Sequence, residues 1–142
     1  MNVKFKKLYQ NAMTPEYATA GAACFDLHAD SGYTIPSHDH SLIGTGLAFE
    51  IPEGYVMLIY PRSGMAANYR ANLMNCVGVI DSDYRGEVIV MLNNDGSTPV
   101  VVKQGTRIAQ AMIMPVPKVE LVLTDRLSDT DRGAGGFGST GE

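Results

Sequence analysis

Apolar residues recur along this chain in many short runs that are separated by glycine and proline. Val3 and Phe5 alternate with lysines, whereas residues 55–60 (YVMLIY) and 88–92 (VIVML) are continuously apolar. Alternation indicates a half-exposed strand, and a short continuous run indicates a buried one. Similar runs predict further strands at residues 24–29, 41–51, 72–80, 100–102, 107–116 and 118–123. Many short strands at close spacing predict an all-β sandwich or barrel.

Two segments interrupt this strand pattern. Residues 64–71 (GMAANYRA) carry alanines at a spacing that predicts a couple of helical turns. Residues 31–40 (SGYTIPSHDH) read as a turn-rich link. The predicted helix begins beside Arg62, Ser63 and Gly64, where free backbone N–H groups attract anions.

The last twelve residues, 131–142, differ from the rest of the chain. Five of the twelve are glycine and only Phe137 is aromatic. Such a segment buries too little apolar surface to order itself, so we expect a β domain at residues 1–130 and a flexible arm at 131–142. The GAGGFG run lacks the strand–helix context of a dinucleotide fingerprint. It is either a mobile terminus or a lid, in which glycine N–H groups, Arg132 and Phe137 close over a phosphate and a ring.

Composition narrows the class of protein. The 142 residues suit one domain, and 45% hydrophobic with 18% charged residues is ordinary for a globular protein. A net charge of −4 argues against nucleic-acid binding, and no stretch is long and apolar enough to span a membrane. Cys24 and Cys76 form no CxxC unit, so a reduced, cytoplasmic protein is expected. His28, His38 and His40 do not form a convincing metal set.

The stretch GVIDSDYRGE, residues 78–87, concentrates charge between two apolar runs. Asp81 and Asp83 are two residues apart, so on an extended chain they face the same side. A close pair of carboxylates can act as a general base or hold a cation. The alternative is a polar hairpin whose aspartates make turn hydrogen bonds.

Two further segments offer contacts to an anion. PRSG, residues 61–64, combines an arginine, a serine and a glycine that allows close backbone approach, although an ordinary turn has the same composition. In RIAQ, residues 107–110, strand alternation places Arg107 on the face opposite to Gln110. Together with the acidic stretch and the Gly-Phe tail, these patches indicate an anionic ligand that carries a ring, such as a nucleotide.

Five motifs, in order along nearly the whole chain, resemble those of the trimeric dUTP pyrophosphatases (dUTPases). They read AACFDLHA (22–29), PRSG (61–64), GVIDSDYRGE (78–87), GTRIAQAMI (105–113) and RGAGGFGSTG (132–141). The first motif departs most from the family pattern, in residues 22–25, although Asp26 is kept.

The resemblance implies a jelly-roll-like distorted β-barrel with one short helix, and a homotrimer with active sites between subunits. It implies hydrolysis of dUTP to dUMP and pyrophosphate by water attack on the α-phosphorus, with Mg²⁺. This reaction limits uracil incorporation into DNA and supplies dUMP for thymidylate synthesis. The alternatives are a dCTP deaminase of the same fold, or a regulatory dUTP-binding protein that acts through a protein partner.

The resemblance also assigns roles to single residues. Asp81 matches the carboxylate that activates the attacking water. Asp26 matches a carboxylate that reaches the water shell of the metal, whose inner ligands are expected to be phosphates and waters. Tyr84 matches the ring under the deoxyribose. The role expected for Asp83 is to stabilise the turn or to hold an arginine.

The remaining matches are substrate contacts. Asn75, with the backbone at Val79 and Ile80, matches a hairpin that reads uracil. In the arm, Arg132 and Phe137 match residues that grip the γ-phosphate and cover the uracil from a neighbouring subunit. Further expected contacts, most of them to phosphates, are Arg62, Ser63, Gly64, Ile89, Gln110 and Gly138.

Overall fold

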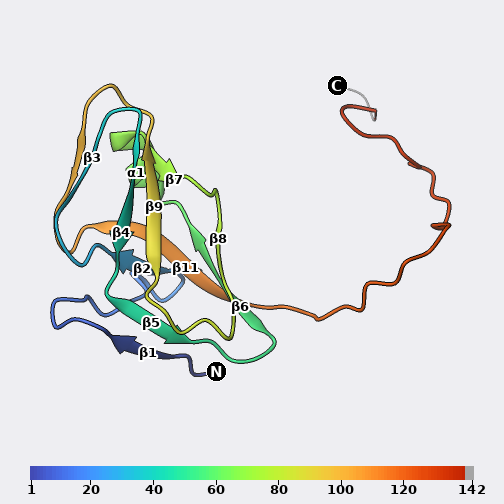
Figure 1. Cartoon of the computed structure of the whole chain (residues 1–142), viewed down its shortest axis with the longest axis horizontal. Helices are drawn as coiled ribbons and strands as arrows, with labels where there is room; N and C mark the ends of the chain where they lie inside the picture. The colour runs from blue at the N-terminus through green and yellow to red at the C-terminus, as the bar shows by residue number, and fades with distance from the viewer. Residues whose placement is uncertain (140–142) are drawn as a thin grey trace.

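The short apolar runs form strands because each run buries one face against the same core. The computed structural model describes residues 1–139 and contains antiparallel strands and one short helix (Figure 1). The elements in chain order are β1 (Lys4–Lys7), β2 (Phe25–His28), β3 (Tyr33–Ile35), β4 (His40–Gly44), β5 (Leu47–Glu50), β6 (Tyr55–Tyr60), α1 (Ser63–Tyr69), β7 (Ala71–Leu73), β8 (Gly78–Ile80), β9 (Ile89–Asn94), β10 (Val100–Val102) and β11 (Arg107–Pro115).

The strands form four antiparallel sheets around one core. Their strand orders are β1–β5, β10–β3, β4–β9–β7 and β2–β11–β6–β8. Most neighbours in these sheets are distant in sequence, which is how a chain of short strands wraps into a barrel. The predicted all-β, jelly-roll-like barrel with one short helix is confirmed. No helix among residues 1–139 has the length and apolar character needed to cross a membrane.

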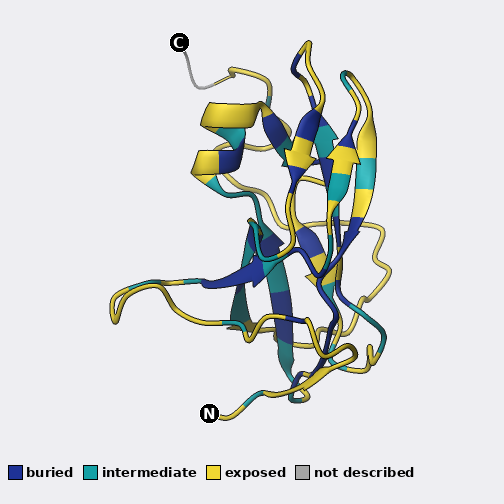
Figure 2. Ribbon diagram, turned by 90° about the vertical axis from the view of Figure 1, so that its left-hand side faces the viewer, coloured by how far each residue is buried: buried dark blue, intermediate teal, exposed yellow. Residues whose placement is uncertain are grey.

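The core draws large side chains from several sheets. Leu27, Ile43, Met57 and Ile108 are fully buried, and Figure 2 shows buried segments turned inward on the strands. Burying each such side chain contributes about 1.5–3 kcal/mol. This shared core makes the barrel a rigid support for the turns at its edges.

Two strand predictions need correction within the barrel. Residues 31–40 are not merely a link, since Tyr33–Ile35 pairs with Val100–Val102 as β3 and buries Ile35 completely. Residues 72–80 are not one strand. Cys76 has φ 61°, a left-handed conformation that breaks the extended chain, so β7 pairs with β9 and β8 pairs with β6 in a different sheet.

The strand predicted at residues 118–123 is also absent from the described part of the chain. After β11 the chain leaves the body of the molecule in an extended path (Figure 1). Leu121 is 91% exposed and Leu123 is 98% exposed. Apolar alternation makes a strand only where a partner strand is available, and among residues 1–139 the segment meets none.

Candidate functional site

The acidic stretch forms a turn that begins where β8 ends. The Tyr84 N–H donates to the Asp81 carbonyl at 3.2 Å, and the Tyr84 hydroxyl donates to the Glu87 carbonyl at 2.9 Å. The tyrosine ring therefore folds back over its own turn. A Cβ at Gly86 would lie 2.4 Å from the Tyr84 hydroxyl oxygen, so only glycine leaves room for this ring position.

The C-terminal end of this turn is tied to the barrel. The Gly46 N–H donates to Glu87 Oε1 at 2.8 Å, and the Thr45 hydroxyl donates to the Val88 carbonyl at 2.6 Å. Glu87 had no expected role, because nothing in the sequence distinguishes an anchoring carboxylate from a surface one. The turn is thus held rigidly enough to aim a side chain.

A hollow of about 210 Å³ lies beside the turn. It gathers five of the predicted site residues together with Glu87: its lining is Val79, Ile80, Asp81, Tyr84, Glu87 and Ile89. Val79 is 61% exposed and Ile89 is 48% exposed, so the hollow has apolar walls open to a ligand or to another chain.

The predicted uracil-reading hairpin has a different form from the one expected. Asn75 lies exposed in the turn between β7 and β8, outside the lining of the hollow. Within the described residues, β7 and β8 share no ladder, because they belong to separate sheets. The segment is a crossover between two sheets, not a paired hairpin.

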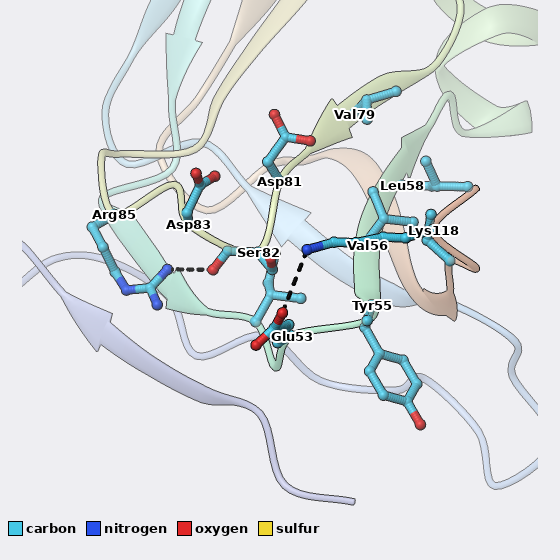
Figure 3. Close-up of a pocket in the computed structure, with 13 residues that line it drawn as sticks. Glu53, Tyr55, Val56, Leu58, Val79, Asp81, Ser82, Asp83, Arg85 and Lys118 are labelled. Atoms are coloured by element: carbon cyan, nitrogen blue, oxygen red, sulfur yellow. Dashed lines mark hydrogen bonds and ion pairs between the residues drawn. The ribbon is translucent and has the colours of Figure 1, made fainter. Parts of the chain in front are cut away.

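Asp83 does not hold the turn or an arginine. Among the described residues it makes no hydrogen bond or ion pair, and Arg85 instead donates to two backbone carbonyls, those of Ser82 and Tyr84. Figure 3 shows Asp81 and Asp83 side by side at the edge of a larger open hollow of about 770 Å³.

A second group of predicted residues surrounds Asp26, which is almost fully buried. Its carboxylate is 3.0 Å from Arg62 Nε and 3.3 Å from an Arg107 guanidinium nitrogen. Gln110 Nε2 donates to the Pro61 carbonyl at 3.0 Å. Two guanidiniums and an amide are thus fixed together, as a phosphate contact requires.

The predicted phosphate turn opens helix α1. Arg62 is the N-cap residue, and Ser63 and Gly64 are exposed in the first turn. The first N–H groups of a helix have no partner within the helix and remain free for an anion.

The prediction that Arg107 and Gln110 lie on opposite faces is wrong. The ladder between β11 and β2 shifts register between Arg107 and Ala109, which is a β-bulge. One extra residue reverses the alternation, so Arg107 reaches Asp26, the residue that faces Gln110 across the ladder. Arg107 is a site residue to which the motif alone assigned no role.

Burial and charge shift the pKa of two groups beside Asp26. Burial lowers the pKa of His28, with Arg107 and Arg62 acting in the same direction and Asp26 against it. Its buried Nδ1 has no hydrogen-bond partner among the described residues. Burial, followed by the Asp26 charge, raises the pKa of the Cys24 thiol. Both pKa shifts favour the neutral forms of His28 and Cys24.

The two groups of site residues lie at opposite ends of β6. Ile80, which precedes Asp81, faces Met57, whereas Gln110 faces Tyr60. Three strand-to-strand steps separate β8 from β2, which is about 14 Å across the sheet, with about 10 Å more along β6. A general base must lie within hydrogen-bond reach of its water. One copy of the chain therefore does not bring Asp81 to the Asp26 cluster.

The arm does not reach either group in this chain. Arg132 Nε donates to the Gly135 carbonyl at 2.9 Å, Phe137 is fully exposed, and the C-terminal segment runs away from the barrel (Figure 1). Gly138 follows with φ 89°, a conformation that favours glycine. Residues 140–142, the end of the predicted arm, lie outside the described residues.

Within residues 1–139, no three His, Cys, Asp or Glu side chains gather closely enough to hold a metal ion. Asp26 nevertheless fits the role of a carboxylate that binds water in a metal's outer shell. An ionised carboxylate offers about four acceptor sites, and the two guanidinium contacts leave room for water.

The fold and these two groups define an all-β protein that binds an anionic ligand with a ring, with one part of the site at each end of a strand. The dUTPase family model matches residues 10–141, and this chain belongs to the dUTPase family.

Full-length relatives carry the same family name. Deoxyuridine 5'-triphosphate nucleotidohydrolase of Nautilia profundicola is 51% identical over 142 residues, which cover all of both chains. The protein of that name from a Picosynechococcus strain is 45% identical and covers 99% of both. The fold is similar to that of a variant of Staphylococcus bacteriophage 80alpha dUTPase with dUpNHpp, at TM-score 0.89 and 27% identity over 99% of both chains.

Proposed function

We propose that this chain hydrolyses dUTP to dUMP and pyrophosphate. The observation that carries the proposal is the hollow that holds the Asp81 carboxylate beside the Tyr84 ring. The names of relatives that match the whole chain support dUTP as the substrate. They favour this reaction over the dCTP deaminase alternative.

Asp81 acts as the general base in this proposal. It is exposed at the start of an anchored turn, where a water can reach its oxygens. The carboxylate takes a proton from the water as the water oxygen forms a bond to the α-phosphorus. The bond from that phosphorus to the bridging oxygen breaks, and pyrophosphate leaves with the electron pair.

Tyr84 and the end of β8 select the nucleoside. The ring locked over Gly86 offers a flat surface to the deoxyribose and leaves no room for a 2′-hydroxyl. Backbone groups near Val79 and Ile80, with Asn75, give uracil a fixed donor–acceptor pattern. Cytosine presents the reversed pattern and would leave buried polar groups unpaired.

The Asp26 cluster receives the triphosphate. Arg62, Ser63, Gly64 and Gln110 contact phosphate oxygens, and Arg107 holds the Asp26 carboxylate in place. Asp26 would reach the water shell of a Mg²⁺ that the substrate phosphates carry. When bound, this ion would neutralise phosphate charge during attack.

The active sites are shared between subunits of a homotrimer in this proposal. The separation of Asp81 from the Asp26 cluster along and across the sheet supports this sharing, because a second copy can supply the missing half. The extended path of residues 116–139 away from its own barrel supports an arm that closes over a neighbouring subunit's site, with Arg132 on the γ-phosphate and Phe137 over the uracil.

The substitution Asp81→Asn tests the catalytic assignment. The amide cannot take the proton, so pyrophosphate release from dUTP should fall by at least about 100-fold, while binding of the analogue dUpNHpp is kept. Calorimetric titration checks the binding. Unchanged turnover would remove Asp81 from its role, and ammonia release from dCTP at a rate comparable to dUTP hydrolysis would favour the deaminase.

A further inference from the structure

We propose that Arg85 is a positioning residue that sets the orientation of Asp81 and Tyr84 through the backbone of their turn. The proposal rests on the proposed function, because it assigns Arg85 to the general base and the sugar platform of that reaction. Arg85 is not part of the lining of the 210 Å³ hollow that holds Asp81 and Tyr84.

The guanidinium of Arg85 bridges two backbone carbonyls of the turn. One of its nitrogens, Nη1, donates to the Ser82 carbonyl at 2.7 Å and to the Tyr84 carbonyl at 2.9 Å. Figure 3 shows the side chain curling back to the Ser82 oxygen. A single charged donor therefore fixes two peptide planes: that of Ser82–Asp83, which lies between the base and the ring, and that of Tyr84–Arg85, which directly follows the ring residue.

Little else holds this part of the turn. The backbone bond from the Tyr84 N–H to the Asp81 carbonyl is long, at 3.2 Å. Asp83 makes no hydrogen bond among the described residues, and within residues 1–139 no other side chain donates to the Ser82 or Tyr84 carbonyl. The far end of the turn has its own anchors, at Glu87, whereas the near end relies on Arg85.

Arg85 also lies beside the strand pair β1–β5 of the barrel. The side chain lies along a hollow of about 380 Å³ beside β1 and β5, whose lining includes Lys4, Phe49 and Glu50. The pKa of the Glu50 carboxyl is lowered chiefly by Lys4, and the Arg85 charge acts in the same direction. Arg85 thus lies between the N-terminal strand pair and the acidic turn, close enough for its charge to act on Glu50.

The test compares Arg85→Met and Arg85→Lys with the matched control Lys4→Met. Methionine keeps most of the apolar stem and removes every donor, whereas lysine keeps the charge with a different donor geometry. Lys4→Met removes one positive charge from the same hollow without touching the turn. Steady-state kinetics with dUTP and UTP, together with thermal unfolding, are measured on the full-length protein.

We expect Arg85→Met to lower kcat for dUTP by about 10- to 100-fold, because small misplacements of a catalytic group cost this much. Its preference for dUTP over UTP should fall as the Tyr84 ring loses its place. Arg85→Lys should recover part of both quantities, and Lys4→Met should match the wild type. A melting temperature within a few degrees of wild type separates positioning from loss of fold.

The proposal would be overturned if Arg85→Met kept the wild-type kcat and the wild-type preference for dUTP over UTP. It would also be overturned if Lys4→Met lost as much kcat and preference as Arg85→Met, because that would indicate an effect of charge alone. If Arg85→Met does not fold, Arg85→Lys decides: reduced kcat and preference support positioning, and wild-type values overturn it. The same assay tests the proposed function separately. If the wild-type protein hydrolyses dUTP and Asp81→Asn does not, the proposed function holds even where the Arg85 proposal fails.

Discussion

At the scale of single residues, the turn from Asp81 to Glu87 depends on a glycine that does no chemistry. Tyr84 folds over Gly86 and donates to the Glu87 carbonyl at 2.9 Å. A side chain at position 86 would occupy the space of the ring. The role of the tyrosine is therefore set as much by the absence of a Cβ two residues later as by the ring itself.

The substitution Gly86→Ala should displace the Tyr84 ring, since the new Cβ would lie 2.4 Å from its hydroxyl oxygen. We expect the preference for dUTP over UTP to fall by about tenfold or more, because the excluded 2′-hydroxyl regains space. Competition kinetics with both nucleotides measure this ratio. The control Gly21→Ala adds a methyl group in open space and should change nothing. An unchanged ratio in Gly86→Ala would contradict the role of the ring.

At the scale of elements, the contacts between the chain and its barrel become few after the end of β11. Up to Pro115 each strand has a partner, and the Val116 N–H still donates to the Gly54 carbonyl at 2.7 Å. Beyond the exposed ion pair of Lys118 with Glu53, the chain has few contacts with its own barrel. Such exposed ion pairs contribute little, about 0–1 kcal/mol.

Deleting residues 131–142 should therefore leave the barrel intact while removing activity. The described part of this segment contacts no core residue, so the melting temperature should stay within a few degrees of wild type. Turnover of dUTP should fall severely, because the site loses Arg132 and Phe137 and stays open to water. Circular dichroism and pyrophosphate release measure the two quantities. An unfolded truncated protein would assign the arm a structural role instead.

At the scale of the whole molecule, the predicted site residues form two groups that lie toward opposite ends of β6. Asp81 follows the strand that pairs at Met57, whereas the Asp26 cluster lies at Tyr60 and beyond. Both groups are built correctly within one chain, yet they lie on the order of 15–20 Å apart. This separation supports the proposal that a second copy brings its Asp26 cluster to this Asp81.

Mixing two inactive variants tests this division. Asp81→Asn and Arg62→Met should each be inactive alone, because each spoils one half of every site. After subunit exchange in equal amounts, about a quarter of the sites combine two intact halves, so activity should recover to about that level. Mass spectrometry establishes the exchange. Subunit exchange without recovery of activity would place both halves of a site in one chain. A mixture of Asp81→Asn with the wild type is the control for dilution of intact subunits.

Much of the fold was predictable because strand periodicity is local. Residues 55–60 and 100–102 form strands with the predicted bounds, and the short helix lies where alanines and Arg62 indicated. Long-range features were not predictable in the same way. The strand at Tyr33–Ile35 exists because Val100–Val102 pairs with it, and the segment at 118–123 is not a strand because it meets no partner.

The sequence by itself determined the barrel class and the family motifs, because these depend on residue type and spacing, and the resemblance of the motifs supplied the predicted site residues. Only the tertiary structure decided how those residues are used. A β-bulge turns Arg107 toward Asp26, Gly86 admits the Tyr84 ring, and Arg85 bridges two carbonyls of the turn in which Asp83 makes no hydrogen bond to any of residues 1–139. These outcomes depend on register and on contacts between distant segments, which the local pattern of apolar and polar residues does not specify.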